Sequence, residues 1–383
     1  MNAAGLKAFT RRPAVIFAIL GLVAVLAFVG VARLVNRFHE QEKALARHLY
    51  ERGMQAQTAG QRELALADFR AALNYARDNF DYQLSLARAL RDTGRTAESE
   101  TYLISLWERT PQDGAVNLAL GRLFAREQAF DKTIQYYHYA TYGFWPGDSG
   151  AKRRDTQFEL IEFLLRSQAY PQAQAELISM AAALPHDSAF RIRVAGMFAR
   201  AQDNEHALGQ FQEVLQSDHD NPSALLGAGQ AAFQMGRYRT AQGYLESAVH
   251  ADPQNTTPSE LLKISTLVLQ ADPYAPRIPE VERNQRLRSA YQTAGERLES
   301  CARSKGIDLS LRSPTGELPA LKSRWLEAAP KVTKLGAHDG SALDAVMEVV
   351  FEIERQTQFL CGPPEGLDEA LLLISQERSG VEQ

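Results

Sequence analysis

Cysteine is scarce in this chain of 383 residues, and so is any excess of positive charge. The two cysteines, Cys301 and Cys361, form no C-x-x-C pair, which excludes a zinc knuckle and a thioredoxin-type redox site. The 42 Lys and Arg residues are outnumbered by 46 Asp and Glu residues, giving a formal net charge of -4. General nucleic-acid binding needs a basic surface, so the composition argues against it.

Catalytic signatures are lacking too. The sequence contains no G-x-G-x-x-G loop, no Walker loop, no H-E-x-x-H and no G-x-S-x-G. The eight histidines are scattered, and no two have the spacing of metal ligands with a third ligand beside them. We therefore expect no enzyme activity, no cofactor and no metal site. A catalytic site assembled from distant residues stays open as an alternative.

One long uncharged run is present, from Pro13 to Ala32. At about 1.5 Å per residue its twenty residues span roughly 30 Å as a helix, the thickness of a bilayer core. A cleaved signal peptide, the alternative, has an apolar region of only about 7–15 residues, and Gly30-Val31-Ala32 is a poor cleavage site. We predict a transmembrane helix over residues 13–32 that stays uncleaved.

Positive residues favour the cytoplasmic side of a membrane. Because they flank this run on both sides, they decide its orientation only weakly. Lys7, Arg11 and Arg12 precede it, and Arg33 and Arg37 follow it. The simpler arrangement has residues 1–12 as a cytoplasmic tail of the inner membrane and the bulk of the chain in the periplasm. The small residues of the run are either a helix-dimer face or merely tolerated in a single span; they include Ala14, Ala18 and Gly21.

Between Ala46 and Asn255 the chain repeats itself every 34 residues, with one step of 40. The blocks begin at Ala46, Phe80, Gly114, Arg154, Ser188 and Pro222, with a partial seventh near Thr256. Small residues dominate the eighth and twentieth positions, where two helices would approach closely, and large apolar residues fill the twenty-fourth. The twenty-fourth residues are Phe69, Leu103, Tyr137, Leu177, Phe211 and Leu245.

This pattern resembles the tetratricopeptide repeat (TPR) family over about 210 of the 383 residues, although no block has the family's tryptophan at its fourth position. The resemblance implies an all-α fold, in which a right-handed solenoid over residues 38–278 is closed by a helical region over 279–383. It also implies a protein or peptide partner rather than chemistry. We expect a membrane-anchored scaffold that serves assembly or maintenance of an envelope or membrane complex. The alternatives are an accessory subunit of an enzyme complex and an enzyme with its site in residues 279–383.

In TPR proteins the first helix of each repeat lines a concave groove, and arginines recur on that face here. Guanidinium groups attract carboxylates, such as those of an acidic peptide or of a chain's C-terminus. The alternative is that they pair with Asp92, Glu127, Glu159 or Glu162. The predicted partner-binding arginines are Arg88, Arg91, Arg122, Arg126, Arg166 and Arg200.

Six extra residues, rich in aromatic side chains, lie between the third and fourth blocks. Insertions in solenoids map to loops and often contact partners, and aromatic residues are frequent at interface hot spots. One hypothesis is therefore a binding lip made of Tyr142, Phe144 and Trp145. The other is that Phe144 and Trp145 fold back and fill the junction between the two repeats.

Apolar patterns after the repeats predict further helices, separated by proline and glycine. These span residues 258–270, 279–304, 318–329, 341–360 and 367–376. Cys301 and Cys361 lie near the ends of two of them. A disulfide between them is expected if the domain is exported, and two free thiols if it is cytoplasmic.

Overall fold

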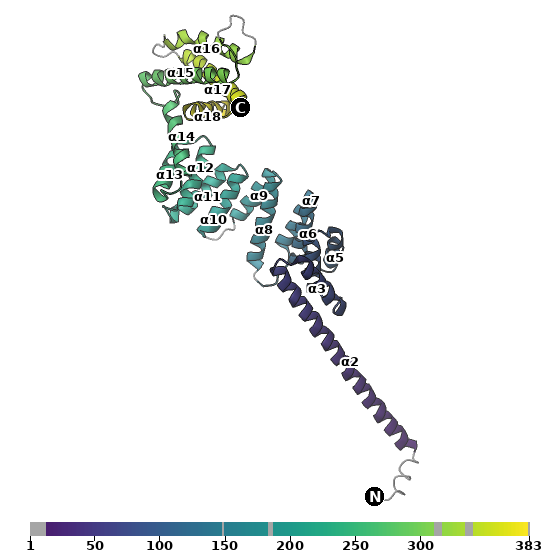
Figure 1. Ribbon diagram of the computed structural model, residues 1–383. Helices are drawn as coiled ribbons and strands as arrows, with labels where there is room; N and C mark the ends of the chain where they lie inside the picture. The colour runs from purple at the N-terminus through teal and green to yellow at the C-terminus, as the bar shows by residue number, and fades with distance from the viewer. Residues whose placement is uncertain (1–12, 148, 183–186, 310–315, 334–339, 382–383) are drawn as a thin grey trace. The chain divides into compact units, whose positions relative to one another are not determined.

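A computed structural model describes residues 13–147, 149–182, 187–309, 316–333 and 340–381 (Figure 1). In these ranges all the named secondary-structure elements are helices, and the β-structure consists of one isolated bridge. This confirms the all-α class. The predicted tail over residues 1–12 lies outside the described residues. The chain divides into two compact units, residues 1–163 and 164–383. The boundary predicted at 278/279 stays a prediction.

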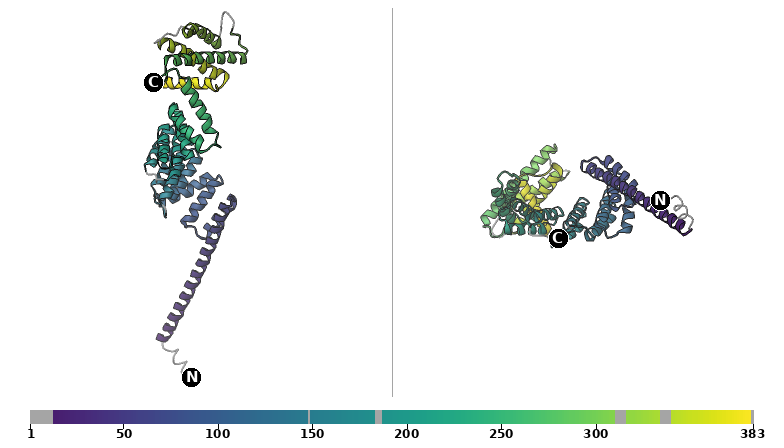
Figure 2. Two further views of the ribbon diagram at one scale, coloured as in Figure 1. Left: turned by 90° about the vertical axis from the view of Figure 1, so that its left-hand side faces the viewer. Right: turned by 90° about the horizontal axis from the view of Figure 1, so that it is seen from below.

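The first unit consists of helix pairs that follow one long helix. That helix, α2, runs without a break from Pro13 to Thr58, so the predicted span continues directly into the first repeat (Figures 1 and 2). The other helices are α3 (Arg62–Tyr75), α4 (Phe80–Asp92), α5 (Thr96–Arg109), α6 (Gly114–Arg126), α7 (Phe130–Tyr142) and most of α8 (Ser149–Arg166).

The second unit continues the helix pairs and then changes to a bundle. Its paired helices are α9 (Tyr170–Ala181), α10 (Ser188–Arg200), α11 (Asn204–Ser217), α12 (Pro222–Gln234), α13 (Tyr238–Ala251) and α14 (Thr257–Ala271). The bundle consists of α15 (Glu280–Ser304), α16 (Glu317–Thr333), α17 (Gly340–Cys361) and α18 (Leu367–Val381).

Capping residues set where the first helix of a block begins. The side chains of Asn79, Asp113, Asp187 and Asn221 accept hydrogen bonds from backbone N–H groups at the starts of α4, α6, α10 and α12. Each of these residues stands directly before the first residue of a block. A helix start leaves four N–H groups without intrahelical partners, and Asn and Asp satisfy them well. The period therefore has a local chemical cause.

The turn between the two helices of a block has the same backbone conformation in every block. The fifteenth residue of all six blocks has a positive φ: it is glycine at Gly60, Gly94 and Gly236, and glutamine at Gln128, Gln168 and Gln202. Glycine adopts this left-handed conformation without strain, whereas a side chain makes it costly. The three glutamines show that the repeat geometry imposes the turn even where the residue disfavours it.

Close packing between the two helices of a block depends on its small residues. A Cβ atom on Gly229 would lie 2.7 Å from Leu245 Cδ2, so only glycine lets α12 and α13 approach this closely. These two residues are the eighth and twenty-fourth of one block. The large residue thus packs into space that the small one leaves.

The bundle and the end of the repeats share one core. Val268 and Ala271 of α14 lie in the same buried cluster as Leu371 and Ile374 of α18, and α18 packs against α14 (Figure 1). Tyr238 of α13 joins this cluster. The seventh block has one helix of its own, and the last helix of the chain covers its apolar side.

Candidate functional site

Four of the six predicted arginines gather on α4 and α6 of the first unit; we call Arg88, Arg91, Arg122 and Arg126 the arginine cluster. Two of them meet a carboxylate. Arg122 donates two hydrogen bonds to Glu159 of α8, one of them from Nε at 2.8 Å. Arg91 donates from Nε and Nη2 to Asp92, at 2.9 and 2.7 Å. For Arg122 and Arg91, a neighbouring acid therefore neutralises part of the positive charge of the cluster.

Arg126 and Arg88 bind backbone carbonyls instead. Arg126 Nη1 donates to the carbonyl of Arg91 at 2.8 Å. Arg88 has only one long contact, from Nη2 to the carbonyl of Ala115 at 3.4 Å. The buried Nε of Arg88 and the buried Nη1 of Arg91 have no hydrogen-bond partner among the described residues. Two N–H groups of the cluster are therefore buried and unsatisfied in this part of the structure.

The electrostatics at Arg88 are unfavourable as they stand. Burial lowers the pKa of the Arg88 guanidinium, and the positive charges of Arg122 and Arg91 lower that pKa further. Arginine still remains protonated in proteins. A buried cation without an anion costs several times more than a buried neutral group. An incoming carboxylate would supply the missing charge, and guanidinium groups bind carboxylates with two parallel hydrogen bonds.

Aromatic side chains lie close to this cluster. Tyr50 of α2 stacks on Tyr82 with ring centroids 4.5 Å apart, and its hydroxyl is 3.2 Å from Ser85 Oγ. Tyr50 also contributes electrostatically at Arg88. The site thus combines guanidinium donors with aromatic surface from the preceding repeat.

The remaining two predicted arginines belong to the second unit. Arg166 is exposed at the end of α8. Arg200, at the end of α10, lines a hollow of about 520 Å³ that we call the second-unit groove. The apolar part of its lining includes Phe211, Phe233 and Leu261, and its polar part consists of Arg200, Gln202, Asn204, Gln230 and Gln234.

This groove is built from the same block positions as the arginine cluster. Gly196 and Gln230 are the ninth residues of their blocks, as Arg88 and Arg122 are of theirs. Arg200 and Gln234 are thirteenth, like Arg126. The two positions are four residues apart, so they lie one above the other on the same helix face. Sequence reasoning missed the two glutamines because it searched for charge; the block register would have found them.

The insert divides its aromatic residues between core and solvent. Trp145 is only 8% exposed, and its indole N–H donates to the carbonyl of Ala140 at 2.8 Å. It packs on Gly114, where a Cβ atom would lie 2.3 Å from the indole. Tyr142 and Phe144 are 77% and 68% exposed. Tyr142 and Phe144 are therefore accessible to a partner. Trp145 instead fills the junction between the third and fourth blocks.

Backbone hydrogen bonds hold the insert in place. The N–H of Phe144 donates to the carbonyl of Gln112 at 2.7 Å, and the N–H of Gly114 donates to the carbonyl of Phe144 at 2.9 Å. This isolated bridge fixes residue 144 beside the start of α6. The exposed side chains of Tyr142 and Phe144 thus project from an ordered support.

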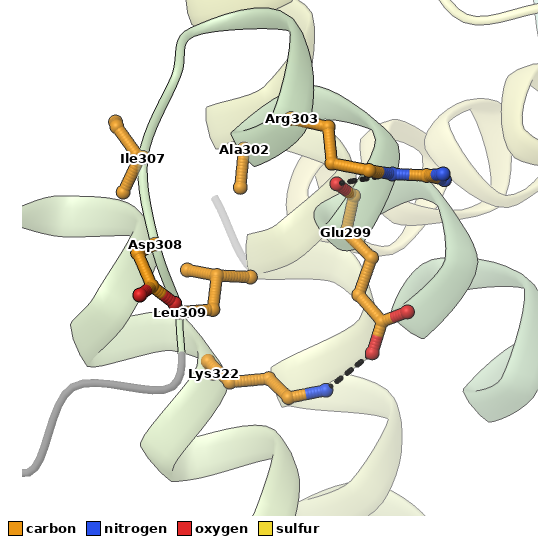
Figure 3. A pocket seen from close by; sticks show the side chains of 7 residues that line it. All are labelled: Glu299, Ala302, Arg303, Ile307, Asp308, Leu309 and Lys322. Carbon is orange, nitrogen blue, oxygen red and sulfur yellow. Dashed lines mark hydrogen bonds and ion pairs between the residues drawn. The ribbon is translucent and has the colours of Figure 1, made fainter.

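The C-terminal bundle contains the second hollow, of about 510 Å³ (Figure 3). Lys322 Nζ and Glu299 Oε1 form an ion pair at 2.7 Å across it, while the guanidinium of Arg303 points away. The hydrogen bond and charge of Lys322 lower the pKa of Glu299. Among the described residues no group of three or more His, Cys, Asp and Glu side chains is arranged to hold a metal ion.

Cys301 and Cys361 are joined by a disulfide, with their Cα atoms 5.7 Å apart. The bond links the end of α15 to the end of α17, across 60 residues of sequence. Arg297 reinforces the same junction by donating to the carbonyl of Gly362 at 2.7 Å. The pairing is one that an exported domain is expected to form.

Comparisons with known proteins concern the repeats. Models of the tetratricopeptide repeat match residues 50–113, 86–149 and 198–262. No curated protein matches the chain.

Several solved structures resemble the chain at low identity. YrrB, a TPR protein with an unusual peptide-binding site, is 16% identical with a TM-score of 0.37, over 50% of this chain and 95% of its own. PilW, a type IV pilus biogenesis factor, is 15% identical with a TM-score of 0.39, over 57% and 98%. The TPR2AB domain of yeast Sti1, in a complex with pHSP90, is 16% identical with a TM-score of 0.26, over 58% of this chain and 99% of its own. These similarities say nothing of what this chain binds.

The block register, the shared positive φ at the fifteenth position and the family matches all describe the same repeat. Each repeat is a pair of helices joined by a tight turn, and the ninth and thirteenth residues lie on one face of its first helix. The chain therefore contains tetratricopeptide repeats, which the family models match over residues 50–149 and 198–262.

Proposed function

We propose that this protein is a membrane-anchored scaffold that holds an acidic segment of a partner polypeptide in the arginine cluster of its first unit. In this role it serves the assembly or maintenance of a complex at a bacterial inner membrane, with its repeats in the periplasm. TPR proteins are generally scaffolds rather than catalysts.

The anchor part of the proposal is supported by α2. The helix is long and apolar enough to cross a membrane, a property that a signal sequence shares. Its C-terminal part is built into the first repeat, where Ala46 and Ala56 are buried. One rigid helix joining both parts favours an anchor that is retained in the mature protein.

The observation that carries the binding proposal is Arg88. Its Nε is buried without a partner, and a free donor of Arg91 lies in the same cluster. Buried polar groups in native proteins are nearly always satisfied, so each exception calls for an explanation. A partner carboxylate, from an acidic side chain or a C-terminus, would satisfy both donors.

The test is crosslinking capture of partner polypeptides from native membranes with Arg88→Met. Methionine keeps an apolar stem of similar length and removes the charge. We expect capture of the dominant partner to fall at least about tenfold, the effect of losing one charge-assisted hydrogen bond. Folding should not suffer, because the variant removes a half-buried cation whose charge is disfavoured by burial and by Arg122 and Arg91.

Arg70→Met is the matched control. Arg70 lies in the same unit and pairs with Glu98 at an exposed site, at 2.6 Å. It makes the same change in net charge, so partner capture should persist. Undiminished capture by Arg88→Met would refute the role of the cluster.

A further inference from the structure

The first half of α2 carries an apolar face that nothing in the described part of the chain covers. From Ile16 to Leu45 every residue is exposed, apart from the half-buried Ala32 and Glu42. Four large apolar residues lie beyond the predicted span: Leu34 is 69% exposed, Val35 46%, Phe38 60% and Leu45 43%. At about 1.5 Å per residue, Leu45 lies roughly 20 Å past Ala32, well outside a bilayer core.

The spacing of this face is that of a coiled coil. Steps of three and four residues alternate without interruption through the span and beyond it, as the a and d positions of a heptad do. We call this set the α2 seam: Phe17, Leu20, Ala24, Ala27, Val31, Leu34, Phe38, Gln41 and Leu45.

The seam residues inside the predicted span differ from those beyond it, and both sets suit the pairing of two helices. Within the predicted span it includes Ala24 and Ala27, and small residues let two membrane helices approach closely. Beyond the span it is Leu34, Phe38 and Leu45. After Leu45 the heptad continues to Arg52, which binds Asp68 of α3 at 2.8 Å. The seam therefore ends where α2 begins to pack inside its own chain.

Charges beside the seam match a parallel arrangement of two copies. Counting Phe38 as an a position makes Arg37 a g position and Glu42 the next e position. In a parallel two-stranded coiled coil, a g residue faces the following e residue of the other helix. Arg37 of one copy would thus lie opposite Glu42 of the second. Within the described chain Arg37 makes no ion pair, and Glu42 has only His39, at 3.4 Å.

We propose that a second copy of this chain covers the α2 seam, so that α2 forms a parallel two-stranded coiled coil from Phe17 to Leu45. Insertion of both copies into one membrane in the same direction also requires the parallel arrangement. The face that contains Ala18 and Gly21 lies about 90° around the helix and is not the interface. The bilayer is the competing occupant, because lipid would cover the first half of the seam in a monomer.

The test is disulfide crosslinking of the full chain in native membranes, using single added cysteines. Leu34→Cys, Phe38→Cys and Leu45→Cys place a thiol on the seam, while Asn36→Cys and Lys43→Cys place one on the outer face of the same helix. The two natural cysteines are bonded to each other and do not compete. On mild oxidation we expect the seam variants to give a species of twice the 42.5 kDa chain mass, at least about tenfold more than the outer variants. Any other pattern overturns the proposal, including equal crosslinking at seam and outer positions.

Charge exchange tests the parallel pairing separately. In the Leu45→Cys background, Arg37→Glu and Glu42→Arg should each lower the crosslinked fraction, about twofold given the modest strength of exposed ion pairs. The double exchange should restore it, because the pair is re-formed with its signs reversed. If the double exchange stays at the level of the single ones, the pairing is wrong. Partner capture can be measured on the same membranes, so failure of the coiled coil and failure of the arginine cluster are distinguishable.

Discussion

The two units use the same block positions to make different surfaces. In the first unit the ninth and thirteenth residues of two blocks are Arg88 with Asp92, and Arg122 with Arg126. In the second unit the corresponding residues are Gly196 with Arg200, and Gln230 with Gln234. The backbone presents both sets in the same way, so the difference lies in side-chain chemistry alone.

That difference predicts two modes of recognition. Guanidinium groups select negative charge, and their long-range attraction is screened by salt. Amides both donate and accept hydrogen bonds, which suits the N–H and C=O groups of an extended peptide backbone. The first unit is therefore expected to select an acidic partner, while the second unit accepts a peptide with little regard to its charge.

The largest effect is expected from removing the tryptophan that supports only the first unit. Trp145→Ala should lower the stability of that unit by about 3–5 kcal/mol, because it leaves a large cavity over Gly114. Hydrogen exchange on the solubilised full chain can locate the loss. Phe144→Ala is the control, since an exposed side chain should contribute less than about 0.5 kcal/mol. Equal loss in both variants would contradict the core role of Trp145.

The second unit contains a buried acidic side chain, whereas the first unit contains the basic Arg88. Glu354 of α17 is fully buried, and its carboxyl group lies beside that of Asp368 of α18. Burial, and next the negative charge of Asp368, raise the pKa of Glu354 well above its ordinary value of 4.5, while Arg297 opposes the shift. The folded state therefore binds a proton that the unfolded state releases, and stability falls as the pH rises from about 4.5 toward the raised pKa.

Glu354→Gln should remove this dependence. We expect a gain of about 1–3 kcal/mol at pH 8 and no gain at pH 4, because glutamine has no proton to release when the chain unfolds. Thermal unfolding at the two pH values measures it. Glu348→Gln, on the exposed side of the same helix, should change stability little at either pH. A gain of equal size at pH 4 would rule out titration as the cause.

Salt dependence separates the two grooves. Partner capture through the first unit should weaken as salt rises from about 50 to 500 mM, and Arg88→Met should flatten that dependence. Gln230→Met in the second-unit groove should lower capture less, about twofold to threefold, and leave the slope unchanged. If both variants flatten the slope equally, the grooves do not differ in the way their side chains indicate.

The smallest effect concerns two glycines of the second unit. Gly196 has open space around its missing Cβ, so Gly196→Ala should stabilise α10 by about 0.5–1 kcal/mol through the helix propensity of alanine. Gly229→Ala should destabilise, because its Cβ would meet Leu245. Opposite signs in thermal unfolding are the expected result, and equal signs would show that packing at these sites has been misjudged.

The sequence predicted the repeats well because their causes are local. Capping residues such as Asn79 and Asn221, and turn glycines such as Gly94, act within a few positions of themselves. The turns at Gln128, Gln168 and Gln202 escaped prediction because glutamine does not favour a positive φ. Only the block register reveals them.

The site was less predictable because its contacts are distant. Whether an arginine is satisfied depends on residues far along the chain: Glu159, which pairs with Arg122, is 37 residues away and lies beyond the insert. The same sequence pattern therefore contains the paired Arg122 and the unsatisfied Arg88. The second-unit groove carried no charge signal at Gln230 and Gln234. The disulfide could not be predicted because it depends on the cellular compartment and on the distance between the two cysteines, and the sequence alone gives neither.

The packing of α18 on α14 has a consequence for how the chain is made. The apolar side of α14, with Val268 and Ala271, is completed by Leu371 and Ile374, about 100 residues later in the sequence. Contacts of such long separation form slowly, whereas each helix pair closes with its neighbours as soon as it is synthesised. The end of the solenoid thus stays open until α18 has been synthesised. A chain that stops before α18 leaves that surface bare, and proteases that recognise exposed apolar segments can attack it.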